Sequence, residues 1–361
     1  MSAPRLAQRP GPAHWTVSRT EGQDDGNELP EVGRPHGCPP FRPLRGAEPP
    51  HFVDRPGAPG LDGTGLLAGF ARALGTGPAD PRSRQLVLGG PAMGKTSLAR
   101  TASRTARQQL DWLVVFHSCA PRARVLGVVA EAALGAVATQ WPHQRAAFAG
   151  AVLRCRASAA ARQREAWEGG TPEHPLPLPP GVGDGVRTSW SGARDALARV
   201  GRFAGSLGRG VLVVLDDLDA LAAGEAEALG WLAHSLAGEG LPVSFLMTGS
   251  PALGERVREA GSFAGTLWHS ELAPLDADEV QEALAVPAAE RGVRFEHQAA
   301  QLVHELSGGA PLEVQRAGFH AWVSSGRRCV VSRADVQAGW EVAQGPGRAG
   351  PSVAGGPDAL P

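Results

Sequence analysis

Gln85-Leu86-Val87-Leu88-Gly89-Gly90-Pro91-Ala92-Met93-Gly94-Lys95-Thr96-Ser97 is the stretch that decides the fold. Its first four residues form a short apolar run typical of a buried strand. The next eight spell G-x-x-x-x-G-K-T, and a helical pattern follows from Thr96 to Gln108. Glycines let the backbone N–H groups turn inward around a phosphate, and a helix N-terminus adds its positive dipole end. We therefore predict a phosphate-binding P-loop, formed by Gly89, Gly90, Pro91, Ala92, Met93, Gly94, Lys95, Thr96 and Ser97.

Lys95 is the only lysine among the 35 Lys and Arg residues of the chain. Its compact ammonium can reach between the β and γ phosphates, which the planar guanidinium of arginine does poorly. The Thr96 hydroxyl is predicted to bind Mg2+. Guanine-specific P-loop proteins commonly read the base through an Asn-Lys-x-Asp loop, and this chain cannot contain one because its single lysine is already used. ATP with Mg2+ is the predicted ligand.

Apolar runs of strand length recur at 112–116, 211–215 and 243–247, with helical patterns between them. Strands that are apolar throughout and alternate with helices indicate a parallel sheet covered on both faces. We therefore predict an α/β fold of the P-loop NTPase type, with three αβα layers over residues 51–270. A proline-rich insert at 168–190 is expected to be a mobile loop.

After about residue 271 the pattern predicts helices only, so an all-helical lid subdomain is expected over 271–345. Asp276 and Glu279 have the spacing of a capping box at the start of its first helix. Residues 1–50 and 346–361 are rich in proline and glycine and are expected to be disordered tails.

Composition limits the classes of partner. The net charge is -1 and the pI is about 6.8, so nothing in the overall charge favours nucleic acid. The four cysteines are widely scattered, which predicts reduced thiols rather than a disulfide framework or a metal site. The apolar runs are too short to span a membrane. We expect a cytoplasmic protein without a membrane partner.

Asp216-Asp217 follows the apolar run that ends at Leu215, as in a Walker B motif. Asp216 is predicted to hold Mg2+ through water, and Asp217 to polarise the attacking water. The alternative role of Asp217 is a loop or capping acid. Because aspartate is one methylene shorter than glutamate, hydrolysis is expected to be slow. Thr248 ends the next strand and is either a polar contact for the γ-phosphate and water or part of a plain turn.

These motifs resemble the AAA+/STAND group of P-loop ATPases, in particular the origin-recognition-like, archaeal-type ATPase domains. Pro40-Phe41-Arg42-Pro43 and Phe52-Val53-Asp54-Arg55 are similar to the family segment that approaches adenine, although Asp54-Arg55-Pro56 stands where the family has Gly-Arg-Glu. Ser307-Gly308-Gly309-Ala310-Pro311 is similar to the Gly-Gly-x-Pro turn of the family lid.

The resemblance implies roles for residues outside the P-loop. Pro311 would face the nucleotide, and Arg316 would be a sensor arginine of the lid, with a plain surface arginine as the alternative. Arg256 or Arg258 would reach a neighbouring subunit of a homo-oligomer as an arginine finger.

Three functions remain open on the sequence. The first is a nucleotide-dependent switch with slow ATP hydrolysis, read by an unknown protein partner. The second is a DNA-associated ATPase of the loader or transposition-helper type. For that function the chain offers a basic row, or else a solvated helix face, at Arg154, Arg156, Arg162 and Arg164. The third is a small-molecule kinase, which the Asp216-Asp217 pair fits less well.

Overall fold

The computed structural model describes residues 39–42, 51–55, 65–78, 80–119, 125–150, 184–221, 223–259, 267–326 and 328–344. Residues 1–34 and 35–361 form two separate units, and every described residue belongs to the second. The C-terminal tail, most of the N-terminal tail, residues 168–183 of the predicted proline-rich insert and the four arginines between 154 and 164 lie outside the described residues. Residues 184–190 of that insert begin helix α5 (Asp184–Ser206), so the prediction of a mobile loop is wrong for them.

A parallel sheet of five strands in the order β2-β3-β4-β1-β5 forms the core of the first part. The strands are β1 (Arg84–Leu88), β2 (Leu113–Ser118), β3 (Val211–Asp216), β4 (Val243–Gly249) and β5 (Trp268–Glu271). The four runs predicted from the sequence are β1 to β4. Strand β5 was not predicted, because its residues Trp-His-Ser-Glu form no apolar run at this edge of the sheet.

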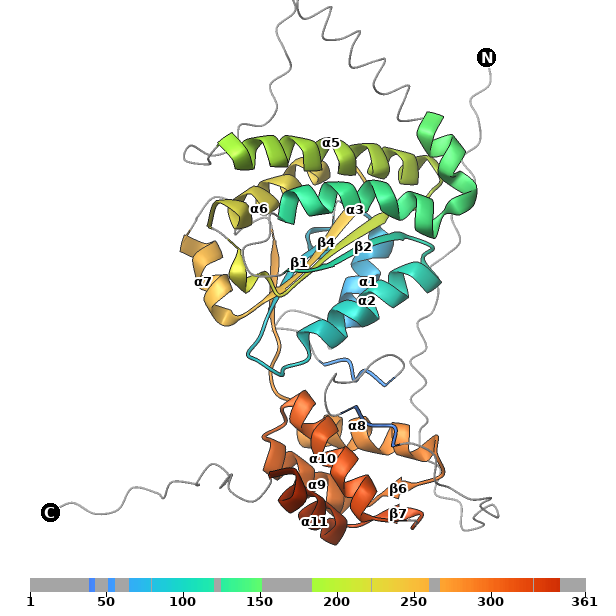
Figure 1. Ribbon diagram of the computed structural model, residues 1–361, viewed down its shortest axis with the longest axis vertical. Helices are drawn as coiled ribbons and strands as arrows, with labels where there is room; N and C mark the ends of the chain where they lie inside the picture. The colour runs from blue at the N-terminus through green and yellow to red at the C-terminus, as the bar shows by residue number, and fades with distance from the viewer. Residues whose placement is uncertain are drawn as a thin grey trace, which may run out of the picture. The chain divides into compact units, whose positions relative to one another are not determined.

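Helices cover both faces of the sheet, which confirms the three-layer prediction (Figure 1). One face packs on α1 (Leu66–Thr76) and α2 (Lys95–Gln109), and the other on α3 (Val125–Gln140), α5 (Asp184–Ser206), α6 (Ala223–Gly238) and α7 (Pro251–Glu259). Neighbouring residues of a strand point to opposite faces, so Val87 belongs to the first core, whereas Leu86 and Leu88 belong to the second. Burial on both faces explains why these strands are apolar throughout.

Three short 3-10 turns complete this part: η1 (Pro81–Ser83), η2 (Pro142–Gln144) and η3 (Leu218–Ala220). Among the described residues no single helix is long and apolar enough to cross a membrane. Helix α3 and the following helical segment Pro142–Gly150, which are bent by 103° relative to each other, are together long and apolar enough to span a membrane, by length and composition alone.

The C-terminal part has a hydrophobic core of its own. It contains α8 (Ala277–Ala289), α9 (His297–Ser307), α10 (Pro311–Ser324) and α11 (Arg333–Gln344), and the predicted capping box of Asp276 and Glu279 is present. The helical prediction is confirmed with one correction. Two short strands, β6 (Arg294–Phe295) and β7 (Val330–Val331), form a parallel pair that two-residue segments could not reveal in the sequence.

Phe41 corrects the prediction of a tail over residues 1–50. Its ring is buried in the C-terminal core and meets Phe295 and Trp322 edge to face, with centroids 5.7 and 6.1 Å away. The backbone N–H of Arg42 donates to Oε1 of Gln315 in α10. The family resemblance placed residues 40–43 near adenine, and a single aromatic among prolines has no periodicity, so the sequence did not show that Phe41 docks in the C-terminal core.

Candidate functional site

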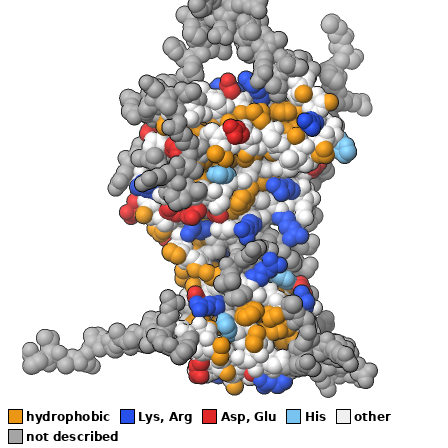
Figure 2. Space-filling view, in the orientation of Figure 1, with side chains coloured by type: hydrophobic (Ala, Val, Ile, Leu, Met, Phe, Trp, Pro, Cys, Tyr) orange, Lys and Arg blue, Asp and Glu red, His pale blue; other side chains and the backbone are white. Residues whose placement is uncertain are grey.

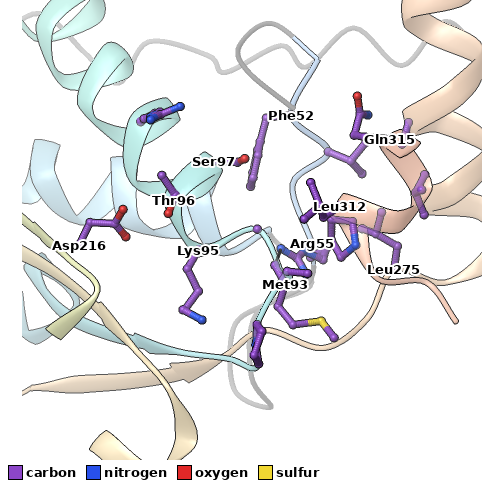
Figure 3. A pocket seen from close by; sticks show the side chains of 18 of the residues that line it. Phe52, Arg55, Met93, Lys95, Thr96, Ser97, Asp216, Leu275, Leu312 and Gln315 are labelled. Carbon is purple, nitrogen blue, oxygen red and sulfur yellow. Dashed lines mark hydrogen bonds between the residues drawn. The ribbon is translucent and has the colours of Figure 1, made fainter. Parts of the chain in front are cut away.

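A pocket of about 840 Å³ lies where the ends of β1 and β3 meet α8 and α10. Its polar end is formed by the P-loop, the start of α2 and the acidic loop after β3. Its apolar end is formed by the upstream segment 51–55 and by residues of the C-terminal helices. The lining includes His51, Phe52, Val53, Arg55, Pro91–Ser97, Arg100, Asp216, Asp217, Asp219, Ser250, Leu275, Ala283, Pro311, Leu312, Val314 and Gln315 (Figure 3).

The P-loop has the backbone shape that phosphate binding requires. Gly94 has φ +83° and Ala92 has φ 65°, so left-handed residues bend the chain into the start of α2. Helix α2 begins at Lys95, and no side chain caps its N-terminus. Its first N–H groups therefore need another acceptor, which an anion can provide. In the structure, Lys95 Nζ donates to the carbonyls of Gly89 and Gly90, at 2.7 and 2.9 Å.

Asp216 is held in place by Thr248. Asp216 is 3% exposed at the end of β3 and lines the pocket. Thr248 Oγ1 donates to Asp216 Oδ1 at 2.6 Å and accepts from the Asp217 N–H at 3.0 Å. Thr248 is fully buried and is not part of the pocket lining. The predicted contact of Thr248 with a nucleotide is therefore replaced by a positioning role, which follows from its place opposite Asp216 on the neighbouring strand β4.

Asp217 lies in the left-handed region, with φ 64°, and its exposed side chain lines the pocket. Partial loss of water raises its pKa, as do a hydrogen bond with Asp219 and the negative charges of Asp219 and Asp216, while Lys95 acts in the opposite direction.

Asp219 is a pocket residue that the sequence analysis did not assign. Both of its oxygens accept from the Ser250 N–H, at 2.9 and 3.0 Å. Burial raises the pKa of Asp219, but the hydrogen bonds from Ser250 and the one shared with Asp217 outweigh it, so the net pKa is lowered. The sequence Asp-Asp-Leu-Asp over 216–219 could have indicated this residue, because it puts a third carboxylate two residues after the Asp216-Asp217 pair, within η3.

The structure does not bring Arg316 to the pocket. Its Nη2 donates to the carbonyl of Ala343 in α11 at 2.9 Å, and its Nη1 lies 3.7 Å from Glu313. It therefore has the alternative role of a surface arginine, whereas Pro311, at the start of α10, lines the pocket as expected. Arg256 bonds the carbonyls of Asp219 and Leu221 in its own chain, and Arg258 is exposed on α7.

The donor set fits a magnesium nucleotide. Among the described residues, no group of three or more His, Cys, Asp and Glu could hold a metal ion. A Mg2+ at Thr96 and Asp216 would therefore need phosphate oxygens and water for most of its six ligands. Such dependence on phosphate is usual for magnesium in nucleotide sites.

Cys119 has no role as a nucleophile here. The residue is buried directly after β2, and its N–H donates to the carbonyl of Asp216 at 2.8 Å. Burial, followed by the negative charges of Asp216, Asp217 and Glu225, raises the pKa of the thiol to about 12. The reactive thiolate is therefore scarce at neutral pH.

A parallel sheet with a P-loop after its interior strand β1, acids after β3 and a helical subdomain beside the pocket defines a P-loop ATPase class of domain. The chain belongs to the AAA ATPase domain family, whose model matches residues 66–246. This match confirms the resemblance to AAA+ ATPases and establishes an ATP-binding P-loop ATPase domain. None of the curated proteins matches the sequence.

Several solved structures are similar to this chain. The Orc1 protein of Aeropyrum pernix, in complex with DNA, is 18% identical with a TM-score of 0.45, and the match covers 76% of this chain and 63% of that one. The Walker-type ATPase PABY2304 of Pyrococcus abyssi is 16% identical, with coverages of 78% and 71% and a TM-score of 0.43. Cdc6p of Pyrobaculum aerophilum is 14% identical, with coverages of 80% and 68% and a TM-score of 0.44.

Proposed function

We propose that this chain is a STAND-like ATP switch: it binds ATP with Mg2+, hydrolyses it slowly, and presents a different lid position to a protein partner in each nucleotide state. One observation carries the proposal. Residues of the P-loop, such as Lys95, and residues of α10, such as Leu312, line the same pocket. A ligand that fills this pocket contacts both parts, so it can favour one arrangement of them over another.

Charged and apolar side chains have different roles in the pocket. We assign Lys95 to the β and γ phosphates and Thr96 and Asp216 to Mg2+, which when bound neutralises phosphate charge. Apolar side chains at the other end, among them Phe52 and Leu275, give the base a desolvated surface. No described residue there provides a lysine for reading guanine.

Slow hydrolysis follows from the acidic loop. Asp217 is the assigned acceptor of the proton from the attacking water, which leaves ADP and phosphate as products. Its side chain is one methylene shorter than that of glutamate, and its hydrogen bond with Asp219 competes with the attacking water for the carboxylate. The partner would then respond to the long-lived ATP-bound state rather than to rapid turnover of ATP.

Calorimetry with Mg-ATP, Mg-ADP and Mg-GTP, together with phosphate release, tests the proposal on the native chain, Lys95→Ala and Lys95→Arg. We expect the native chain to bind ATP and ADP better than GTP, and both variants to bind poorly, because a guanidinium fits badly between the phosphates. Arg291→Ala, in an exposed turn after α8, is the matched control and should bind normally. A native chain that does not bind Mg-ATP would refute the proposal.

A second candidate, a DNA-associated ATPase, is favoured by a basic row on α2. Arg100, Arg104 and Arg107 are exposed on this helix, and neither α1 nor α2 contains an acidic residue. Figure 2 shows Lys and Arg side chains gathered over α2. Helical spacing puts the three arginines along one side, and Arg100 also lines the nucleotide pocket. Such a row suits the phosphates of a nucleic acid strand.

Binding of labelled DNA at several salt concentrations tests this candidate. The logarithm of the affinity should fall with the logarithm of salt with a slope of about -0.7 to -0.9 per phosphate contact. Arg104→Gln with Arg107→Gln should reduce the slope by about 1.5. Arg199→Gln with Arg202→Gln on α5, where both arginines pair with acids, serves as the control. The absence of binding at low salt would remove this candidate.

A further inference from the structure

Four carbonyl groups of the P-loop accept hydrogen bonds from side chains or from a distant part of the chain. When the N–H groups of such a loop face an anion, its carbonyls point elsewhere and need donors of their own. Lys95 Nζ donates to the carbonyls of Gly89 and Gly90. The N–H of Leu312 in α10 donates to the carbonyl of Ala92 at 3.3 Å. Arg55 Nη2 donates to the carbonyl of Met93 at 2.7 Å. Two consecutive carbonyls of the loop are thus held from outside.

Arg55 also bonds the linker that leads to the C-terminal helices. Its Nη1 donates to the carbonyl of Ala273 at 2.6 Å, and the side chain is buried, with only 5% of the residue exposed. The linker itself is tied at both ends: Leu272 N–H donates to Leu88 of β1, and Leu275 N–H donates to Gly309 before α10, each at 2.8 Å. One guanidinium therefore connects the P-loop to the linker that precedes the lid helices. Figure 3 shows Arg55 next to Met93 and Leu312.

The backbone of residues 54 and 55 is fixed to the start of helix α1, on the sheet side of the pocket. The carboxylate of Asp54 accepts from the N–H groups of Leu67 and Ala68 at 2.8 and 2.9 Å, which caps the start of α1. The carbonyl of Arg55 accepts from Leu66 N–H at 2.7 Å. Because the guanidinium bonds both Met93 and Ala273, a displacement of the P-loop that keeps both hydrogen bonds also displaces the linker.

We propose that Arg55 is a positioning residue that makes the P-loop and the lid change conformation together. This inference rests on the proposed function. Phosphate binding draws Lys95 away from Gly89 and Gly90, which alters the loop, and the change reaches the linker through Met93, Arg55 and Ala273. Nε of Arg55 is buried and has no partner among the described residues. An unpaired buried donor is costly, so a rearrangement that gives Nε a partner would favour the second state.

Hydrogen exchange of the lid, measured with and without saturating Mg-ATP, tests the coupling separately from binding. We expect nucleotide to slow exchange in α10 of the native chain and to have little effect there in Arg55→Ala. The Mg-ATP affinity of Arg55→Ala should fall about tenfold, within the usual range of coupling between two sites. Arg55→Lys keeps the charge but cannot bridge two carbonyls with one compact ammonium, so it should behave like Arg55→Ala and provides the test if Arg55→Ala does not fold.

Arg194→Ala is the matched control, because Arg194 also joins two elements, α5 and α6, through Ser235 and Glu239 away from the pocket. It should lose stability but keep the lid response. A lid response in saturated Arg55→Ala and Arg55→Lys equal to that of the native chain would overturn the role of Arg55. So would a native chain that binds Mg-ATP without any lid response. A native chain that does not bind Mg-ATP at all would instead overturn the proposed function on which this inference rests.

Discussion

Replacing Thr248 by valine removes one hydroxyl that makes two buried hydrogen bonds, and its effect can be worked out from the structure. The hydroxyl donates to the Asp216 carboxylate and accepts from the Asp217 N–H. A hydrogen bond to a charged group contributes about 1.5–3 kcal/mol, and an amide left unpaired costs about 1–3 kcal/mol. Burial of the extra methyl offsets about 0.8 kcal/mol. The free energy of unfolding should therefore fall by about 2–5 kcal/mol.

Chemical denaturation of the native chain, Thr248→Val and Thr248→Ser measures this loss. Thr248→Ser keeps the hydroxyl and should lose about 1 kcal/mol, the usual cost of a small buried deletion. The matched control is Ser244→Ala, because Ser244 is buried on the same strand but its hydroxyl has no partner among the described residues. Its unfolding free energy should be unchanged or slightly higher.

The same variants separate a positioning role from a direct one. If Thr248 only orients Asp216, Thr248→Val should weaken binding of Mg-ATP much more than binding of ATP without Mg2+. Phosphate release by Thr248→Val should fall roughly 10-fold to 100-fold, as is usual when the partner of a metal ligand is removed. The reasoning would be refuted if Thr248→Val unfolded within 0.5 kcal/mol of Ser244→Ala, since the hydrogen bonds to Thr248 would then contribute little at this site.

Three further predictions concern the pocket and its surroundings. Gly94→Ala should lower stability by about 1–2 kcal/mol, because φ is +83° and a Cβ would lie 3.1 Å from a guanidinium nitrogen of Arg55. The control Gly127→Ala has open space around the added Cβ and should not lower stability. Thermal melts of the two variants measure the difference. Cys119 should resist iodoacetamide at pH 8, whereas the exposed Cys329 should react. Mass spectrometry of the digested protein measures the labelling of each cysteine. Rapid labelling of both would contradict the raised pKa of Cys119. Burial raises the pKa of Asp54 despite hydrogen bonds from backbone N–H groups and the positive charge of Arg55, so the folded state takes up a proton more readily than the unfolded chain. Above the ordinary pKa of about 3.9, the stability of the native chain relative to Asp54→Asn should fall as the pH rises through the folded pKa, and a difference that grows with pH would contradict this sign.

The fold could be predicted largely because its signals are local. The strand β1, the P-loop and α2 are consecutive, and their residue types must satisfy their own backbone geometry, as Gly94 does at φ +83°. Asp216 was predicted for the same reason, since a carboxylate after an apolar strand is visible within six residues. By contrast, β5 is a short edge strand with polar residues and carries no such pattern.

The roles of Thr248 and Arg316 could not be predicted because they depend on partners far along the chain. Thr248 lies 32 residues from Asp216, and only the register of β3 against β4 decides that its hydroxyl meets the carboxylate rather than the pocket. Arg316 lies 27 residues from Ala343, whose carbonyl it bonds. A sequence pattern gives the residue type and the end of the strand or helix, but several contacts within reach of a long side chain satisfy the same pattern.

Arg55 shows how the support of a recognisable motif can be invisible in the motif itself. Nothing in the P-loop sequence requires an external donor for the carbonyl of Met93, because any donor, including water, would satisfy it. The chain uses an arginine 38 residues upstream, and the same guanidinium bonds a carbonyl 218 residues further along. A water molecule would have satisfied Met93 without connecting it to Ala273. A buried side chain with two separate donors joins the loop to the linker, so this connection depends on Arg55 rather than on the glycines and lysine that mark the site.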